Sequence, residues 1–292
     1  MLHCLGTLIQ GPMGSHKENA VTQDKVRTAR DGAKAPIFRL SRFSGLDDVI
    51  QGFSMRRGPG ANAGEFNMSF TTASATDHVV ENRRAFCRAL GVPLERAVFM
   101  QQSHGNRVAV ITKADWGRGA GSPESAVPST DAMITRERNV FLAALGADCA
   151  LVPLCDPVAG VVGIAHAGWR GTVRGAVENA VRRMCSEMGC DPAHIVAGIG
   201  PTIGPCCYEV GPDVLQAAAK GCGAEAVVQR GGKSYFDLRR ANIQQLLAAG
   251  VRKENIEAAD VCTACERERF FFSYRRDGRT GGRFCGIIGM RP

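Results

Sequence analysis

The segment Phe141–Gly171, FLAALGADCALVPLCDPVAGVVGIAHAGWRG, is the most apolar part of the chain and indicates the class of fold. It contains three short aliphatic runs, Phe141–Leu145, Ala150–Leu154 and Val161–His166, separated by glycine, aspartate and proline. Runs of this length and composition are typical of buried strands. These three runs predict that strands dominate the centre of the molecule. The periodicity after them predicts a helix from about Gly171 to Met188.

The same patterns extend outward from this segment in both directions. Further strands are expected at Pro36–Phe43, Val49–Met55, Ala97–Gln101, Arg107–Thr112, Asp131–Thr135, Ile195–Gly200 and Phe284–Met290. Further helices are expected at Thr76–Leu90, Pro212–Lys220 and Leu238–Ala249. Because strands outnumber helices and do not alternate with them, the sequence predicts an α+β fold with central mixed β-sheets and helices packed outside.

The chain is expected to contain one domain. Residues 1–35 are polar, charged and without hydrophobic period, which predicts a disordered or poorly ordered N-terminal arm. Residues 36–292 are expected to form a single catalytic domain. No apolar run reaches the ~18 residues needed to span a bilayer, and no secretory signal is recognised at the N-terminus.

Charge and cysteine content argue against a nucleic-acid-binding protein and against a disulfide-stabilised one. The net charge is +8, but the basic residues are scattered pairs and no nucleic-acid-binding module accompanies them. A partner nucleic acid is therefore not expected. Twelve cysteines in a chain with its own hydrophobic core favour free thiols over a disulfide scaffold. We expect a reduced, cytoplasmic protein, either a monomer or a homodimer.

Three residues are candidates for one metal site. His104 and His166 each stand where a strand should end next to glycine, and Cys149 lies at a corner between two strands. Strand ends beside glycine are places where a scaffold presents reactive side chains. Two imidazoles and one thiolate suit zinc, and three protein ligands are typical of a catalytic site that keeps one place open.

Other motifs are interpreted as structural. Cys262-x-x-Cys265 has no second CxxC pair and no thioredoxin-like unit around it. Cys206-Cys207 is interpreted as packing. The glycines from Gly198 to Gly204 have the wrong spacing for a dinucleotide-binding loop, and Pro201 interrupts the helix that such a loop requires.

Spacing alone does not join the three distant ligands, but a family resemblance does. The chain resembles the YfiH-like family, also called the laccase-domain or multicopper polyphenol oxidase family. The matching motifs are Gly52–Arg56, Asn82-Arg83, Gln102–Gly105, Asp131-Ala132, Ala147–Cys149, His166–Gly171, Ile199–Gly204, Tyr208–Gly211 and Phe272–Arg276.

The resemblance implies a zinc site formed by His104, Cys149 and His166. It also implies phosphorolysis of the purine nucleosides adenosine, inosine and methylthioadenosine, with adenosine deamination as a second activity. Zinc lowers the pKa of a bound water to about 7, which suits deamination. Cys149, His166 and Arg170 are the expected catalytic residues.

Further residues are expected to bind substrate. Arginine is a natural clamp for phosphate because its planar fork binds two oxygens. Arg56 and Arg170 are the candidates for that role. Phe53, Asn82 and Gln102 complete the predicted substrate-binding set.

Three alternatives remain open at this point. The first is a metal-free Cys–His hydrolase, with Cys149 as nucleophile and His166 as base, acting on an amide of a cell-wall precursor. The second is a copper polyphenol oxidase, although a four-copper site needs roughly ten histidines and the chain has six. The third is a binding protein with a vestigial site.

Overall fold

The computed structural model describes residues 26–27, 35–58, 65–72 and 75–292. Its strands are β1 (Val26–Arg27), β2 (Ile37–Phe38), β3 (Val49–Ser54), β4 (Ala97–Phe99), β5 (Val108–Val110), β6 (Ala132–Thr135), β7 (Phe141–Gly146), β8 (Ala150–Asp156), β9 (Val161–Ala167), β10 (Val196–Ile199), β11 (Val227–Arg230), β12 (Lys233–Phe236), β13 (Ile256–Ala258) and β14 (Phe284–Met290). Its helices are α1 (Thr76–Leu90), α2 (Trp169–Val173), α3 (Ala176–Met188), α4 (Pro212–Gly221), α5 (Leu238–Ala248) and α6 (Tyr274–Asp277).

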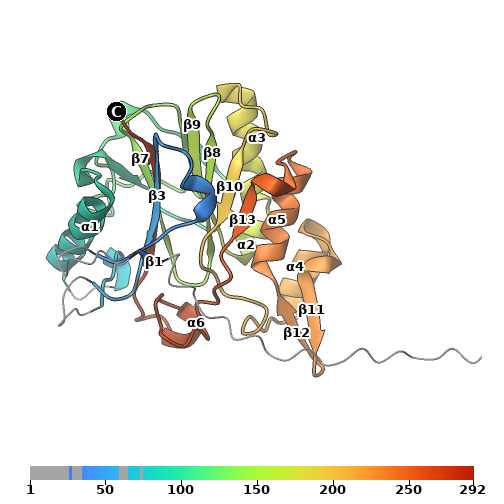
Figure 1. The fold of residues 1–292 in the computed structure, drawn as a ribbon. Helices are drawn as coiled ribbons and strands as arrows, with labels where there is room; N and C mark the ends of the chain where they lie inside the picture. The colour runs from blue at the N-terminus through green and yellow to red at the C-terminus, as the bar shows by residue number, and fades with distance from the viewer. Residues whose placement is uncertain (1–25, 28–34, 59–64, 73–74) are drawn as a thin grey trace, which may run out of the picture.

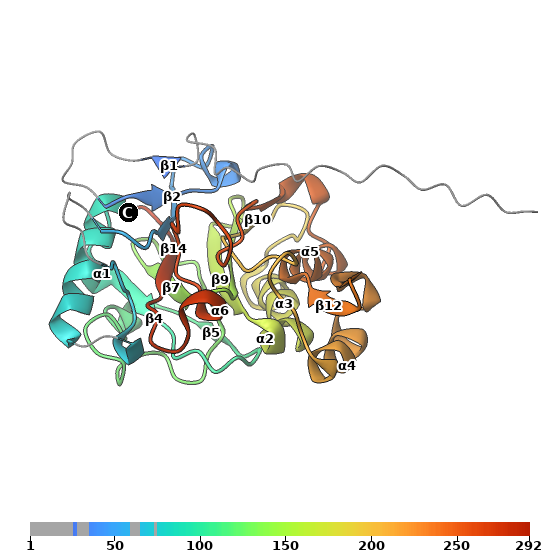
Figure 2. The same ribbon diagram turned by 90° about the horizontal axis from the view of Figure 1, so that it is seen from below.

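Two mixed sheets form the centre of the fold (Figure 1). The first has the strand order β1-β2-β3-β14-β7-β4, and the second has the order β13-β10-β8-β9-β6-β5. The strands β11 and β12 form a separate hairpin. Helix α1 covers the outer face of the first sheet, and helices α3 and α5 cover the outer face of the second (Figures 1 and 2). The expected α+β class with helices outside is confirmed.

The main core lies between the two sheets. Phe53 and Leu142 of the first sheet pack in one cluster with Leu151 and Ile164 of the second. The long strand β8 is buried at all seven positions, as is its antiparallel partner β9. Strands buried on both faces read as continuous apolar runs rather than alternating ones. This explains why the segment Phe141–Gly171 is so apolar.

Most predicted elements are present, with differences at glycines and turns. The single helix expected over Gly171–Met188 is two helices, because Gly175 adopts a left-handed φ of 75° between α2 and α3. The strand expected over Pro36–Phe43 shortens to β2, followed by a 3₁₀ turn at Ser41–Phe43. The hairpin β11–β12 was not predicted. Most of the expected N-terminal arm lies outside the described residues.

The chain crosses between the sheets on one side of the molecule. Strand β4 belongs to the first sheet and β5 to the second, so the segment between them passes from one sheet to the other. The short turn between β7 and β8 does the same. These two crossings bring His104 and Cys149 to one edge of the sandwich. Among the described residues, no helix is both long and apolar enough to cross a membrane.

Candidate metal centre and cavity

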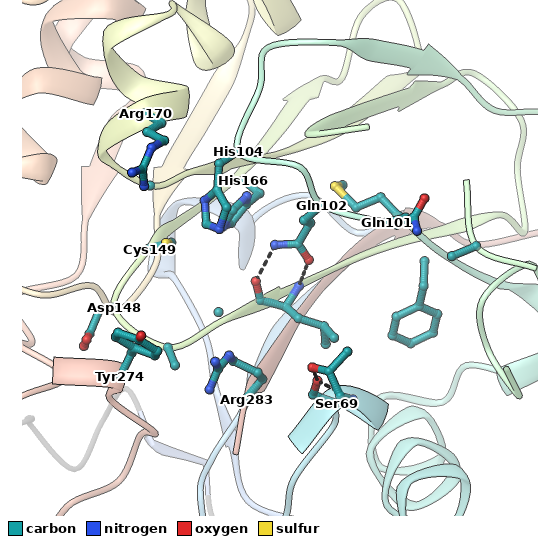
Figure 3. Close-up of a pocket in the computed structure, with 18 of the residues that line it drawn as sticks. Ser69, Gln101, Gln102, His104, Asp148, Cys149, His166, Arg170, Tyr274 and Arg283 are labelled. Atoms are coloured by element: carbon teal, nitrogen blue, oxygen red, sulfur yellow. Dashed lines mark hydrogen bonds between the residues drawn. The ribbon is translucent and has the colours of Figure 1, made fainter. Parts of the chain in front are cut away.

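The three predicted metal ligands converge on one point. His104 lies on the β4–β5 crossing, Cys149 on the β7–β8 turn, and His166 on the end of β9. Their ligand atoms all lie within 4.8 Å of one another. The two imidazole rings lie 4.9 Å apart between centroids, beside the Cys149 thiol (Figure 3). The predicted juxtaposition of these residues is therefore present in the fold.

A buried carboxylate, Asp131, orients both histidines. Asp131 precedes β6 and is fully buried. Its Oδ1 accepts hydrogen bonds from the backbone N–H of His104 and from His166 Nδ1, both at 2.9 Å. Its Oδ2 accepts from the backbone N–H of Gly105 at 2.7 Å and from the hydroxyl of Ser103 at 2.8 Å. The bond to Nδ1 leaves Nε2 of His166 as the nitrogen that faces the centre, an arrangement common in zinc sites.

The loop around Asp131 holds His104 in an unusual backbone conformation. His104 has a φ of 58°, in the left-handed region that non-glycine residues seldom adopt. Three consecutive backbone N–H groups, from Ser103 to Gly105, all point at the Asp131 carboxylate. The carboxylate thus stabilises the turn that presents the His104 ring.

Cys149 and His166 shift each other's pKa values toward an ion pair. Burial by itself would raise the pKa of the Cys149 thiol, but the charge of His166 and hydrogen bonds from His104 and His166 lower it to about 6. Burial would likewise lower the pKa of His166, but the Cys149 charge and the Asp131 hydrogen bond raise it to about 9. At neutral pH, Cys149 is therefore a thiolate, which is the form that binds metals and attacks electrophiles.

The ligand set lies in the wall of a cavity of about 680 Å³. Volumes between roughly 300 and 1,000 Å³ are typical of sites for small molecules. Trp169, Tyr208 and Tyr274 contribute aromatic surface to the lining. Four arginines also line it, namely Arg83, Arg170, Arg275 and Arg283. Of these, Arg170 and Arg283 lie on opposite sides of Cys149 in Figure 3. The cavity therefore combines a metal-ligand set, flat apolar surfaces and cationic groups.

The predicted substrate-binding residues are placed differently from one another. Gln102 lines the cavity, but its amide is engaged, since it donates to the Leu145 carbonyl and accepts from the Leu145 N–H, both at 2.8 Å. Phe53 lies in the core between the sheets at 1% exposure, outside the cavity lining. Asn82 donates to the backbone carbonyl of Asn67 and also lies outside the lining.

Of the two arginines predicted to bind phosphate, one lines the cavity and the other does not. Arg56 forms ion pairs with Glu65 and Asp277 and is not part of the cavity lining. Arg170 lines the cavity, stacks on Trp169 at 4.3 Å, and forms no ion pair with any described carboxylate. Its guanidinium is therefore available to an anion in the cavity, whereas that of Arg56 is already neutralised.

Asp131 and Arg283 were given no role in the site by the sequence analysis. Asp131 was recognised as the start of a strand and as part of a family motif, but not as a partner of the two histidines. Arg283 lies near the C-terminal strand, and nothing in its immediate sequence indicates a cavity. It donates to the Gly281 and Gly282 carbonyls at 2.6 and 2.9 Å, and burial lowers its pKa.

A second cluster brings the remaining cysteine motifs together. Cys206 and Cys207, expected only to pack, lie together with Cys262 and Cys265, expected to have no partner pair. All four Sγ atoms lie within 4.8 Å of one another. The two motifs are 55 residues or more apart in sequence, so neither alone predicts the cluster. None of the described cysteines forms a disulfide.

Comparison with known proteins identifies the family. Residues 50–291 match the family described as multi-copper polyphenol oxidoreductase laccase. The chain belongs to this family, and the resemblance inferred from the motifs is confirmed.

Two relatives and one solved structure are similar over most of their length. Purine nucleoside phosphorylase YlmD of Geobacillus stearothermophilus is 39% identical over 250 residues, covering 83% of this chain and 90% of that protein. Adenosine deaminase RL5, from an unknown prokaryotic organism, is 35% identical over 252 residues, covering 84% and 96%. The crystal structure of YlmD from Geobacillus stearothermophilus matches with a TM-score of 0.82 at 37% identity, covering 89% of this chain and 97% of that one.

Asp131→Asn should weaken metal binding without removing a ligand. An amide has one acceptor oxygen where the carboxylate has two, so the bonds that orient His104 and His166 cannot all form. Loss of such an orienting partner lowers metal affinity by about 10–100-fold. Competition with a chromophoric chelator measures the affinity.

Asp156→Asn is the matched control for this prediction. Asp156 is also buried, at 1% exposure, and accepts backbone N–H bonds from Val158 and Ala159, but it is not part of the ligand set. The Asp156→Asn substitution should lower thermal stability and leave metal affinity unchanged. Equal losses of affinity in both variants would contradict an orienting role for Asp131.

Proposed function

We propose that this protein is a zinc-dependent purine nucleoside phosphorylase that cleaves adenosine, inosine and methylthioadenosine, with adenosine deamination as a second activity. One observation supports the proposal above all others. The His–Cys–His ligand set lies in the same cavity as Arg170 and Arg283, two arginines that can face an anion. The similarity to YlmD and RL5, whose names state these two activities, supports the choice of substrate class.

The residues present fit zinc. His104, Cys149 and His166 supply two nitrogens and one sulfur, the mixed donor set that zinc accepts, and leave one tetrahedral place open. Gly168 faces this set, and a Cβ atom there would lie 2.7 Å from Cys149 Sγ, so the space beside the ligands is kept by the absence of a side chain. When bound, zinc would supply Lewis acidity and lower the pKa of a coordinated water to about 7.

Copper oxidation fits this chain less well despite the family's description. The cavity offers two histidines and one cysteine as metal ligands, and the whole chain has six histidines. Coupled multicopper chemistry requires several imidazole-rich sites. The donor set instead matches a single borderline-soft ion, which favours zinc.

The protein's own groups account for the handling of phosphate and nucleoside. Arg170 lies in α2 and Arg283 directly precedes β14, so the two side chains border the cavity from different segments and can approach an anion from different sides. Arginine binds phosphate oxygens through charge-assisted hydrogen bonds. Trp169, Tyr208 and Tyr274 provide flat surfaces for the purine base. Phosphorolysis requires that phosphate be held against the ribose C1′. A phosphate oxygen forms a bond to C1′ as the bond from C1′ to N9 breaks, and the purine leaves with that electron pair and takes up a proton.

One rival is favoured by a specific observation. Asp131, His166 and Cys149 form a hydrogen-bonded series, and the pKa values of Cys149 and His166 are shifted toward a thiolate–imidazolium pair. Such a series is the arrangement of a Cys–His hydrolase, with Cys149 attacking an amide carbon. His104, however, also points its ring at the thiol and has no role in that mechanism. The metal-centred proposal uses all three residues.

A nucleoside screen with and without phosphate tests the proposed function. Adenosine, inosine and methylthioadenosine are incubated with purified protein, and free base, ribose 1-phosphate and ammonia are measured separately. We expect base release that requires phosphate and is matched by the sugar phosphate. Ammonia release without any free base would make deamination the principal activity, and hydrolysis of an amide alone would favour the rival.

Arg170→Lys should weaken the response to phosphate while leaving the metal bound. Lysine keeps the positive charge but loses the two-point fork. Hydrogen bonds to charged groups contribute about 1.5–3 kcal/mol, so the KM for phosphate should rise about 10–100-fold. Steady-state kinetics with varied phosphate measures this.

Arg182→Lys is the control for this prediction. Arg182 is an exposed arginine that pairs with Glu178 on α3, away from the cavity lining. The Arg182→Lys variant should have the same KM for phosphate as the natural protein. An unchanged KM for phosphate in Arg170→Lys would assign the phosphate to Arg283 instead, and the same substitution there would then show the rise.

A further inference from the structure

The four-cysteine cluster is formed by two loops that leave one edge of the second sheet. Strands β10 and β13 are parallel neighbours, with Ala197 opposite Ile256 and Ile199 opposite Ala258. Parallel strands end at the same edge, so the segments after them emerge side by side. A further parallel bridge joins Thr202 to Cys262. The sheet thereby places Cys206 and Cys207 of the first loop against Cys262 and Cys265 of the second.

The separations of the four sulfur atoms suit ligands of one metal ion. The Sγ atoms of Cys206 and Cys265 are 3.5 Å apart, and all four lie within 4.8 Å of one another. Four sulfurs at 2.3 Å from a tetrahedral zinc ion are separated by roughly 3.8 Å. The backbone N–H of Gly204 donates to Cys262 Sγ at 3.3 Å. Cys206 and Cys265 are exposed, which is not the environment of cysteines that serve as apolar filling.

We propose that Cys206, Cys207, Cys262 and Cys265 bind a second zinc ion with a structural role. Four protein thiolates complete the tetrahedral shell, so this site leaves no place for substrate or water, in contrast to the three-ligand set in the cavity. Soft thiolates alone also select zinc over the hard cations. The proposal does not depend on the proposed function, because none of the four cysteines lines the cavity.

The second ion would stabilise the part of the cavity wall formed by Asp148 and Cys149. Between the cysteines and β10, the backbone N–H of Ile203 donates to the Asp148 carbonyl at 3.0 Å. On the other loop, the Thr263 hydroxyl donates to Asp148 Oδ1. Asp148 directly precedes the ligand Cys149 and has a left-handed φ of 92°. An ion that joins the two loops therefore stabilises the corner from which Cys149 reaches the cavity.

The test counts zinc in full-length protein whose cavity site has been removed. Cys149→Ala protein, purified under reducing conditions with zinc supplied, is analysed for metal per chain. We expect about one zinc per chain, the number for one four-cysteine site. Its X-ray absorption spectrum should show sulfur neighbours only, at about 2.3 Å. Adding Cys206→Ser and Cys265→Ser, both at exposed positions, should bring the zinc content close to zero.

Stability and thiol chemistry separate this role from the alternatives. A strong chelator should lower the melting temperature of Cys149→Ala protein and leave that of the triple variant unchanged. Cys185→Ser in the Cys149→Ala background is the control, because Cys185 is half-buried on α3 outside both clusters, and it should retain the zinc. Zinc-free Cys149→Ala protein, or a Cys206–Cys265 disulfide found in freshly purified protein, would overturn the proposal.

Discussion

Cys149→Ala is expected to abolish nucleoside cleavage and to release one zinc equivalent per chain. Cys149 supplies the only sulfur and the only negative charge of the three-ligand set. Two neutral imidazoles hold zinc weakly, and a bound metal contributes several kcal/mol of charge stabilisation, so the rate should fall about 10³-fold or more. Base release from adenosine in the presence of phosphate, measured beside zinc content, checks both parts.

The control for this substitution is Cys185→Ser. That residue is a half-buried cysteine of α3, outside both cysteine-containing clusters. The variant should keep the zinc and the activity of the natural protein. Full activity in Cys149→Ala would contradict a metal-centred mechanism, since no other described residue near the two histidines offers a thiolate.

Gly168→Ala should also lower the rate strongly, although it removes no ligand. The backbone of Gly168 has φ of −71° and ψ of 176°, which any residue adopts, so alanine causes no backbone strain. Its Cβ would lie 2.7 Å from Cys149 Sγ and 3.1 Å from His104 Nδ1. Both donors must move, and displacement of about 1 Å at a reacting centre costs about 100-fold in rate. Activity and zinc affinity should therefore fall together.

Gly45→Ala is the matched control. A Cβ at Gly45 meets no atom within 4 Å, so this variant should behave as the natural protein. Circular dichroism and melting temperature should show that Gly168→Ala remains folded. Retention of zinc and activity in folded Gly168→Ala protein would mean that the space between these residues does not hold the metal.

The fold could be predicted well where burial is continuous. The runs that become β7, β8 and β9 are buried on both faces, so their apolar character alone marks them as strands. The helix Thr76–Leu90 was predicted with the bounds that the structure shows, because its apolar positions repeat and Gly91 ends it in a left-handed conformation. The hairpin β11–β12 was missed because its residues are mostly exposed or half-buried and carry little periodic signal.

The site was predictable only in part, because its residues meet through topology. His104, Cys149 and His166 could be joined through family resemblance, and the crossings between sheets now explain why they meet. Asp131 acts through hydrogen bonds to backbone N–H groups, which leave no mark in the sequence. Arg283 directly precedes the last strand, and the pairing of β14 with β3 and β7 places it beside the cavity.

The cysteine cluster could not be predicted from the sequence for the same reason, because the fold brings distant residues together. Cys206-Cys207 was interpreted as packing, and Cys262-x-x-Cys265 was not interpreted as a site because the sequence has no second CxxC pair. The parallel pairing of β10 with β13 brings the two loops together. Sequence spacing rules detect metal sites whose ligands come from one local segment, and this cluster comes from two.

The measurement that tests the central claim most directly is the dependence of adenosine cleavage on zinc. Protein is dialysed against a strong chelator, incubated with adenosine and phosphate, and assayed for adenine before and after zinc is restored. We expect no adenine from the metal-free protein and recovery of both adenine and ribose 1-phosphate once zinc is returned. Metal-free protein that releases adenine as fast as the zinc-loaded protein would contradict a catalytic metal at His104, Cys149 and His166.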